Sequence, residues 1–118
     1  MSRIMEMSRD LGQALARTDE YQALKRAVDG TNDDRELAEM RSTLEQLEGR
    51  IEASLRAGQE PEDSVKEEYE QAVMRLQANS TYQRLVAAQS NFDKVLMKVN
   101  QTIQEGIASG AESRIVLP

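Results

Sequence analysis

The residues of this chain that could carry chemistry are its carboxylates, which gather in the middle of the sequence. Close groups of acids occur at Asp33-Asp34, at Glu45 with Glu48, and at Glu67-Glu68-Glu70. Paired carboxylates can act as a general acid and base, and dimetal helical bundles combine them with histidine in Glu-x-x-His motifs. The chain has no histidine, and these acids lie off the apolar positions where a core site would be built. We therefore expect a solvated acidic face with no metal site.

The residue types needed for nucleophilic, redox and phosphate chemistry are also missing from the sequence. The chain has no cysteine, which excludes thiolate metal ligands, Fe–S ligation and a cysteine nucleophile. Its serines have no histidine to activate them, and no glycine-rich loop joins a strand to a helix around a phosphate. The sequence therefore predicts a protein that is not an enzyme and holds no cofactor.

The balance of charge argues against direct nucleic-acid binding. Residues 33–70 contain thirteen acids and five bases, a net charge of −8, which repels phosphate groups. Base stacking needs a basic groove beside aromatic rings, and we expect the rings of Tyr21, Tyr69, Tyr82 and Phe92 to anchor helix ends in the core instead. The acidic stretch is expected to be a solvated helical face, with a docking surface for a basic partner as the alternative.

The composition indicates an all-α domain with one modest core. The chain has 118 residues, of which 39% are hydrophobic, 31% charged and only 3% aromatic, which suits a bundle of Leu, Ile, Val, Met and Ala side chains. The sequence contains no run of about 18 apolar residues, the length that a membrane-spanning helix needs. The first residues also lack the apolar core of a signal peptide. We expect a cytoplasmic protein.

The strongest pattern is a pair of matched apolar stripes, one in residues 37–55 and one in residues 85–103. In both, apolar residues follow at intervals of three, four, three, four and four, which places each stripe on one face of an α-helix. We predict that the two stripes pack together in a hairpin or bundle of two long antiparallel helices. The predicted core or interface residues are Leu37, Met40, Leu44, Leu47, Ile51, Leu55, Leu85, Ala88, Phe92, Val95, Val99 and Ile103.

Turn and capping residues divide the chain into its elements. Gly58 can end one helix in the left-handed conformation, and Pro61 fits the first turn of the next, so residues 55–65 are predicted to form the hairpin tip. Two short N-terminal helices, capped by Ser2 and by Thr18 or Asp19, are expected to cover one end of the hairpin. The predicted caps of the later helices are Thr31 or Asn32, and Asn79-Ser80.

Ser109-Gly110 is expected to end regular structure. The predicted organisation is a single helical domain over residues 1–108 and a flexible C-terminal tail over residues 109–118. Within that tail, Ile115-Val116-Leu117 could dock on a core or on a neighbouring subunit. Small chains often associate to complete a core, so we expect a homo-oligomer, a dimer or higher.

Two stretches of the sequence resemble a known family. They are Asp19-Glu20-Tyr21-Gln22-Ala23-Leu24-Lys25-Arg26-Ala27 and the junction from Leu76 to Gln89, followed by the phased residues Phe92, Val99, Ile103 and Ile107. With the long acidic helix between them, they resemble the YlbF/YmcA family of small bacterial helical proteins. The resemblance implies an all-α, oligomeric, cytoplasmic regulatory protein. Some members act as accessory factors of an endoribonuclease that matures messenger RNA, and influence competence, sporulation and biofilm formation.

The sequence departs from those members in two ways. They carry cysteines that hold Fe–S clusters, whereas this chain has none, and it lacks the proline often expected after Asn79. It resembles the cysteine-free branch of the family. The expected function is a non-enzymatic regulator or adaptor that binds unidentified protein partners through helix–helix contacts. The alternative is a structural or chaperone-like hairpin that grips clients with the tip near Gly58 or with the tail.

Overall fold

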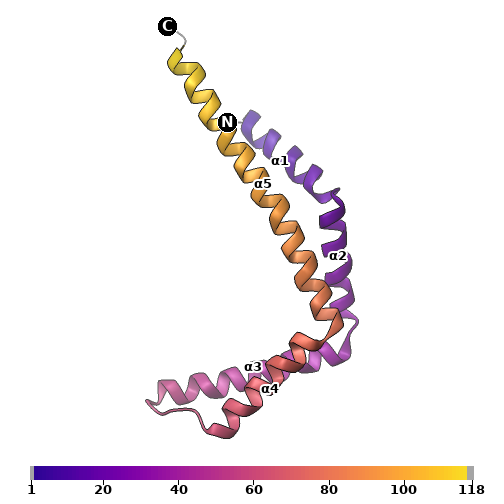
Figure 1. The fold of residues 1–118 in the computed structure, drawn as a ribbon, viewed down its shortest axis with the longest axis vertical. Helices are drawn as coiled ribbons and strands as arrows, with labels where there is room; N and C mark the ends of the chain where they lie inside the picture. The colour runs from indigo at the N-terminus through magenta and orange to yellow at the C-terminus, as the bar shows by residue number, and fades with distance from the viewer. Residues whose placement is uncertain (1, 117–118) are drawn as a thin grey trace. The chain divides into compact units, whose positions relative to one another are not determined.

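The computed structural model describes the backbone of residues 2–116 and the side chains of residues 2–111, and this part of the chain is all-α, without strands. Its helices, labelled in Figure 1, are α1 (Ser2–Ala16), α2 (Asp19–Asn32), α3 (Arg35–Arg56), α4 (Asp63–Ala78) and α5 (Ser80–Val116). Contacts divide the chain into two units. We call residues 25–87 the hairpin unit, and the described residues of 1–24 and 88–118 the terminal unit.

Polar side chains start three of the helices in the same way. Thr18, Asp34 and Asn79 each accept a hydrogen bond from the backbone N–H three residues further on, at 3.1, 3.0 and 2.9 Å. These bonds satisfy backbone donors that the first helical turn leaves free. The caps predicted at Thr18 and Asn79 are confirmed. The cap predicted at Thr31 or Asn32 was wrong, because α2 continues through Asn32 and the Thr31 hydroxyl donates to the Val28 carbonyl within it.

Gly58 turns the chain at the hairpin tip. Its φ of +73° is left-handed, as predicted, and the N–H of Gln59 donates to the Ser54 carbonyl at 2.9 Å. This is the Schellman pattern that ends helices at glycine. The helix α4 begins only at Asp63, with Glu62 as its cap residue. Pro61 therefore lies before the helix. The prediction that Pro61 occupies the first turn of the helix was wrong.

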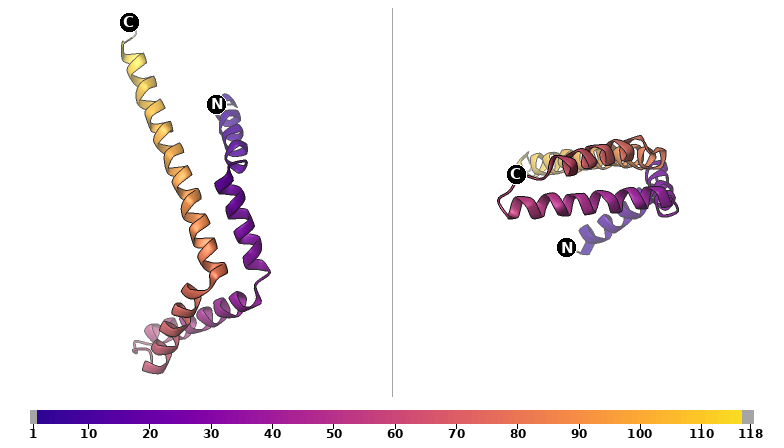
Figure 2. Two further views of the ribbon diagram at one scale, coloured as in Figure 1. Left: turned by 45° about the vertical axis from the view of Figure 1, so that its right-hand side comes forward. Right: turned by 90° about the horizontal axis from the view of Figure 1, so that it is seen from below.

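The core of the hairpin unit lies between α3 and α4, which run side by side (Figure 2). Buried Leu44 and Leu47 of α3 pack with Val65 and Ala72 of α4. Partly buried apolar side chains surround this cluster: Ile51, Tyr69, Val73 and Leu76. The Tyr69 hydroxyl reaches the Glu48 carboxylate at 3.5 Å.

Within the hairpin unit the α3 stripe is covered by α4, so the predicted pairing of the α3 stripe with the α5 stripe is not confirmed. Each of the two matched stripes forms an apolar helix face, but the spacing of apolar residues does not specify which helix packs on which face. The short tip returns the chain at once, so α4 reaches α3 first and takes up its stripe. The predicted core position Leu55 lies at the end of α3 and is exposed.

The terminal unit contains the remaining part of the α5 stripe. Ala88 is buried, and the Phe92 ring meets the Tyr21 ring edge-to-face, with centroids 5.2 Å apart. The helix α5 continues through Ser109 and Gly110 to Val116, so the prediction that regular structure ends there was wrong. A glycine weakens a helix by about 1 kcal/mol without having to end it. The division into domain and tail stays a prediction, and docking of Ile115-Val116-Leu117 lies outside the described side chains.

Candidate protein-interaction surfaces

The first surface is the apolar face of α1, which nothing in the described structure buries. Ile4, Met7 and Leu11 recur at helical spacing, and Ile4 is 59% exposed and Leu11 38% exposed. No residue of α1 is buried. A helix of 15 residues is marginal by itself in water, because most helical stability comes from packing an apolar face. The face therefore has the apolar composition of a buried helix face, although its side chains are exposed.

A groove in the terminal unit continues this face onto α5. Its apolar walls are Leu11 of α1 and Val95, Val99 and Ile103 of α5. Polar side chains line it as well: Glu20, Lys98 and Thr102. An apolar groove with a few polar groups can accept a helix from another protein through apolar contacts, with the polar groups selecting its orientation.

Further along α5 the apolar stripe is increasingly uncovered. Every side chain described from residue 101 to residue 111 is exposed, including Ile103 and Ile107. Met97 is exposed as well. Flexible methionine side chains adapt to varied partner shapes. Residues 101–111 of α5 thus continue the amphipathic pattern of a packed helix, although their side chains are exposed.

The predicted core and interface residues fall into three groups by burial. Leu37, Leu44, Leu47 and Ala88 are buried, whereas Leu55 and Ile103 are exposed. The remaining six are partly buried: Met40, Ile51, Leu85, Phe92, Val95 and Val99. Sequence reasoning left the α1 residues out of this set, although their spacing is helical, because it assigned the N-terminal helices to cover the hairpin.

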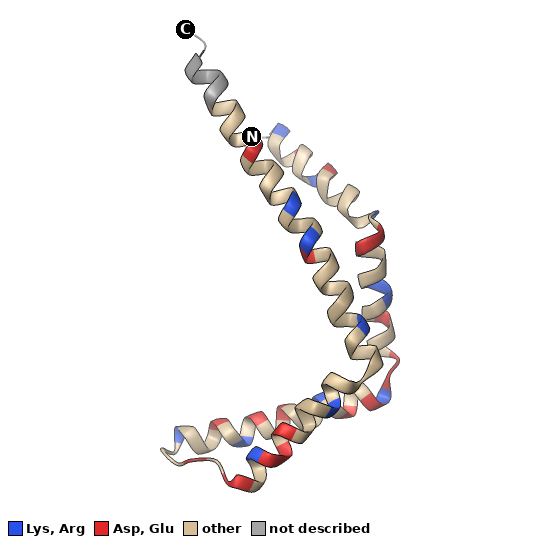
Figure 3. Ribbon diagram, in the orientation of Figure 1, with Lys and Arg blue, Asp and Glu red and all other residues tan. Residues whose placement is uncertain are grey.

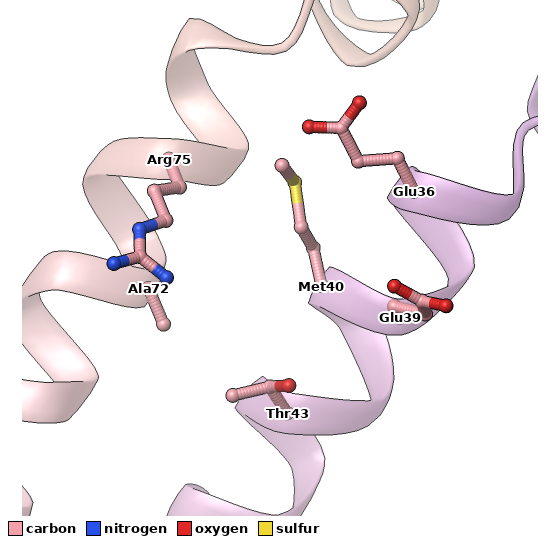
Figure 4. A pocket seen from close by; sticks show the side chains of 6 residues that line it. All are labelled: Glu36, Glu39, Met40, Thr43, Ala72 and Arg75. Carbon is pink, nitrogen blue, oxygen red and sulfur yellow. The ribbon is translucent and has the colours of Figure 1, made fainter.

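A second, more polar groove lies on the hairpin unit (Figure 4). Glu36, Glu39 and Thr43 line it from α3, and Arg75 lines it from α4, with Met40 and Ala72 between them. The carboxylates and the guanidinium face a surface open to water. This arrangement offers recognition of charged groups by its two carboxylates and its guanidinium. Among the described residues, no group of three or more acidic side chains is placed to hold a metal ion.

The two units differ in net charge. The hairpin unit has nine bases and fourteen acids, a net charge of −5, and the acids are prominent along α3 and α4 (Figure 3). The described side chains of the terminal unit have five bases and six acids, a net charge of −1. Interactions through the hairpin unit therefore favour basic partners, whereas the terminal unit is close to electrically neutral.

Within the hairpin unit, the Asp34 carboxyl caps the first turn of α3. The backbone N–H of Leu37 lowers the pKa of the Asp34 carboxyl from its usual range, and a hydrogen bond from the Thr81 side chain lowers that pKa further. Hydrogen bonds to the charged form of a carboxylate favour ionisation. The charged Asp34 thus stabilises the start of α3, where it accepts the N–H of Leu37.

In the part of the chain that the structure describes, these features define an all-α protein whose candidate sites are exposed apolar and charged surfaces. The family model described as "Control of competence regulator ComK, YlbF/YmcA" matches residues 4–108. The chain belongs to this family, as the sequence resemblance suggested. No curated protein matches the chain. In the described part, no helix is long and apolar enough to cross a membrane.

Two solved structures share the fold. One is Bacillus subtilis RicA in complex with RicF, with 12% sequence identity and a TM-score of 0.84 over 93% of this chain and 97% of that one. The other is a protein of unknown function (DUF964) from Bacillus stearothermophilus, with 21% identity and a TM-score of 0.62 over 90% of this chain and 93% of that one.

Proposed function

We propose that this protein is a non-enzymatic cytoplasmic regulator or adaptor that acts by binding other proteins through the exposed apolar faces of α1 and α5. The observation that carries the proposal is the uncovered stripe at Ile4, Met7 and Leu11. Each large apolar side chain left in water forgoes about 1.5–3 kcal/mol of burial. A partner helix would recover part of that free energy.

The family supplies the biological setting of the proposal. Its model is described by control of a competence regulator, and one similar structure, RicA, is a complex with a second protein, RicF. By this analogy, the chain would join a multi-protein complex that controls gene expression or RNA processing, with effects on competence, sporulation or biofilm formation. It would do so without an Fe–S cluster, because it has no cysteine to ligate iron.

The proposal is tested with two baits that differ in where one negative charge is added. Ile4→Glu places a carboxylate on the apolar face of α1, and Gln13→Glu places one on the opposite face of the same helix. Tagged full-length chains are expressed in the native cells and their bound proteins are quantified by mass spectrometry. We expect a stoichiometric partner that is retained by Gln13→Glu and lost by Ile4→Glu.

Two results would count against the adaptor. If both baits recover the same partner equally, the partner does not bind to the apolar face of α1. Suppression of client aggregation by the purified chain, without any stoichiometric partner, would favour the chaperone-like alternative.

A further inference from the structure

Two adjoining grooves follow one flank of the α3–α4 hairpin. The groove of Figure 4 has a volume of about 410 Å³, and a second groove of about 660 Å³ continues it toward the hairpin tip. Thr43 lines both of them. Glu68 of α4 lines the second groove, together with Gly49, Arg50 and Ala53 of α3. The two grooves therefore form one open channel between the helices, which we call the seam groove.

The seam groove has the length and the apolar lining that suit a helix. It extends along α3 from Glu36 to Ala53, a distance of about 26 Å at the helical rise per residue. Its apolar lining includes Met40 and Ala72. A Cβ added at Gly49 would meet nothing within 4 Å, and small residues allow neighbouring helices to approach closely. A third helix could therefore lie along this flank, in the helix-in-groove mode of recognition.

The charged side chains of the groove lack partners of opposite sign in the described structure. Glu36 and Glu39 line the groove from α3, and Arg75 lines it from α4 (Figure 4). The one ion pair among the described residues joins Arg56 to Glu52 and lies outside the groove. The carboxylates and the guanidinium are thus available for the charges of a ligand.

The net charge of the hairpin unit is concentrated beside one end of the groove. Residues 60–70 contain six acids and one base, a net charge of −5, whereas the rest of the unit has eight acids and eight bases. Glu68 belongs to this acidic segment and lines the groove. At the other end of the groove, Glu36 and Glu39 outnumber Arg75. This distribution favours an occupant with positive charge at both ends.

A second copy of this chain does not supply such an occupant. The net charges of α1 to α5, in chain order, are 0, −1, −1, −2 and +1. No helix among these five is therefore strongly basic. A second copy would also bring a net charge of −6 toward another of −6, and like charges oppose association. The charge pattern thus selects a different protein.

We infer that the seam groove binds a basic amphipathic helix of a partner protein. Lysine or arginine side chains of that helix pair with Glu36 and Glu39 at one end and with Glu68 at the other. Arg50 and Arg75 pair with acidic or carbonyl groups of the helix and so fix its direction. The groove belongs to the hairpin unit and contains no residue of α1, so the inference goes beyond the proposed function and does not depend on it.

The test uses the purified full-length chain and two fluorescent helical peptides of about 18 residues, the length of the groove. Both peptides have leucine and alanine on one face. The opposite face has lysine in the first peptide and glutamate in the second. Fluorescence anisotropy at physiological ionic strength should show saturable binding of the lysine peptide to one site per chain. The glutamate peptide should not bind.

Two variants of equal net charge distinguish the groove from general attraction. Glu39→Gln with Glu68→Gln removes two carboxylates that line the groove, and Glu45→Gln with Glu70→Gln removes two that do not. We expect the groove variant to bind the lysine peptide about tenfold more weakly, because two charge pairs are lost. The control variant should lose about twofold or less, because salt screens distant charges. All four side chains are exposed, so circular dichroism should show parental helicity in both variants.

Methyl NMR locates the bound peptide without any substitution. Met40 lines the groove. Met74 of α4 is 68% exposed and lines neither groove, and Met7 lies on the exposed face of α1. With isotope-labelled methionine methyl groups, the lysine peptide should shift the Met40 signal most and leave the Met74 signal in place.

The inference would be overturned by a lysine peptide that does not bind, by equal binding of the glutamate peptide, or by equal weakening in the two variants. A largest shift at Met7 would also overturn it, because the peptide would then occupy α1. None of these results decides the adaptor proposal, which depends on partner recovery by the Ile4→Glu bait. Conversely, Ile4→Glu should leave binding of the lysine peptide unchanged.

Discussion

The hairpin unit and the terminal unit use the same apolar spacing with opposite results. On α3 the stripe leads to Leu37 and Leu47, which are buried, whereas the same intervals on α5 lead to Ile103, which is exposed. The difference lies in the connections. A short loop that contains Gly58 returns α4 onto α3. Among the described residues, Ile4 and Met7 of α1 and residues 101–111 of α5 have no comparable cover. Periodicity thus specifies an apolar face, and the connection decides whether that face is filled within one chain.

Matched leucine truncations would give the largest contrast between the units. Leu47 is 4% exposed, and Leu47→Ala should lower the free energy of unfolding by about 2–5 kcal/mol, because it leaves a cavity in the hairpin core. Leu11→Ala should cost about 1 kcal/mol or less, since the side chain is partly exposed already. Urea unfolding of dilute protein, followed by circular dichroism, measures both. Equal losses would contradict the division into a filled and an unfilled unit.

The ring pair tests how much packing the terminal unit has by itself. Phe92→Leu keeps an apolar side chain but removes the edge-to-face contact with Tyr21. We expect a loss of about 0.5–1.5 kcal/mol beyond the change in buried area, the usual worth of an aromatic pair. A double-mutant cycle with Tyr21→Leu isolates this coupling. A coupling of zero would show that the rings are neighbours without stabilising the unit.

Two glycine substitutions should change stability in opposite directions. Gly58→Ala puts a Cβ on a residue with a φ of +73°, which costs about 1–2 kcal/mol. Gly49→Ala, in the interior of α3, should stabilise by about 0.5–1 kcal/mol, because the new Cβ meets nothing within 4 Å. Thermal unfolding of the two variants measures the difference. Destabilisation by Gly49→Ala would reveal a close neighbour of α3 that this chain does not contain.

The smallest expected effect is a dependence on pH at Asp34. Its pKa is lowered in the folded protein, first by the N–H of Leu37 and then by Thr81. The resulting stabilisation is present above the pKa of the unfolded chain and is lost as the pH falls through the folded pKa. Asp34→Asn should therefore have a lower melting temperature than the parent near neutral pH. That gap should shrink in acid below about pH 4, and a gap that is constant with pH would contradict the ionic role.

Much of the local structure could be predicted from particular residues. Thr18 and Asn79 marked helix starts through their side-chain oxygens, and Gly58 marked the tip because glycine readily adopts positive φ. The family also followed from sequence, since the Tyr-Gln junctions and the phased stripe are local patterns. The cap at Asp34 was missed because Thr31 and Asn32 are equally good capping types a few residues earlier, and only the hydrogen bonds distinguish them.

The sequence by itself determined an all-α chain, its apolar faces and its lack of histidine and cysteine. Propensity, capping and periodicity are properties of neighbouring residues. Only the tertiary structure decided that α4 covers the apolar face of α3. It also showed that Ile4, Met7 and Leu11 of α1 are exposed in the part of the chain that it describes. Both outcomes depend on contacts between residues far apart in the chain. Apolar faces with identical spacing could each pack on the same partner helix, so the spacing does not specify the pairing. At the candidate interaction surface, the local apolar pattern predicts burial, whereas the tertiary structure leaves the side chains exposed.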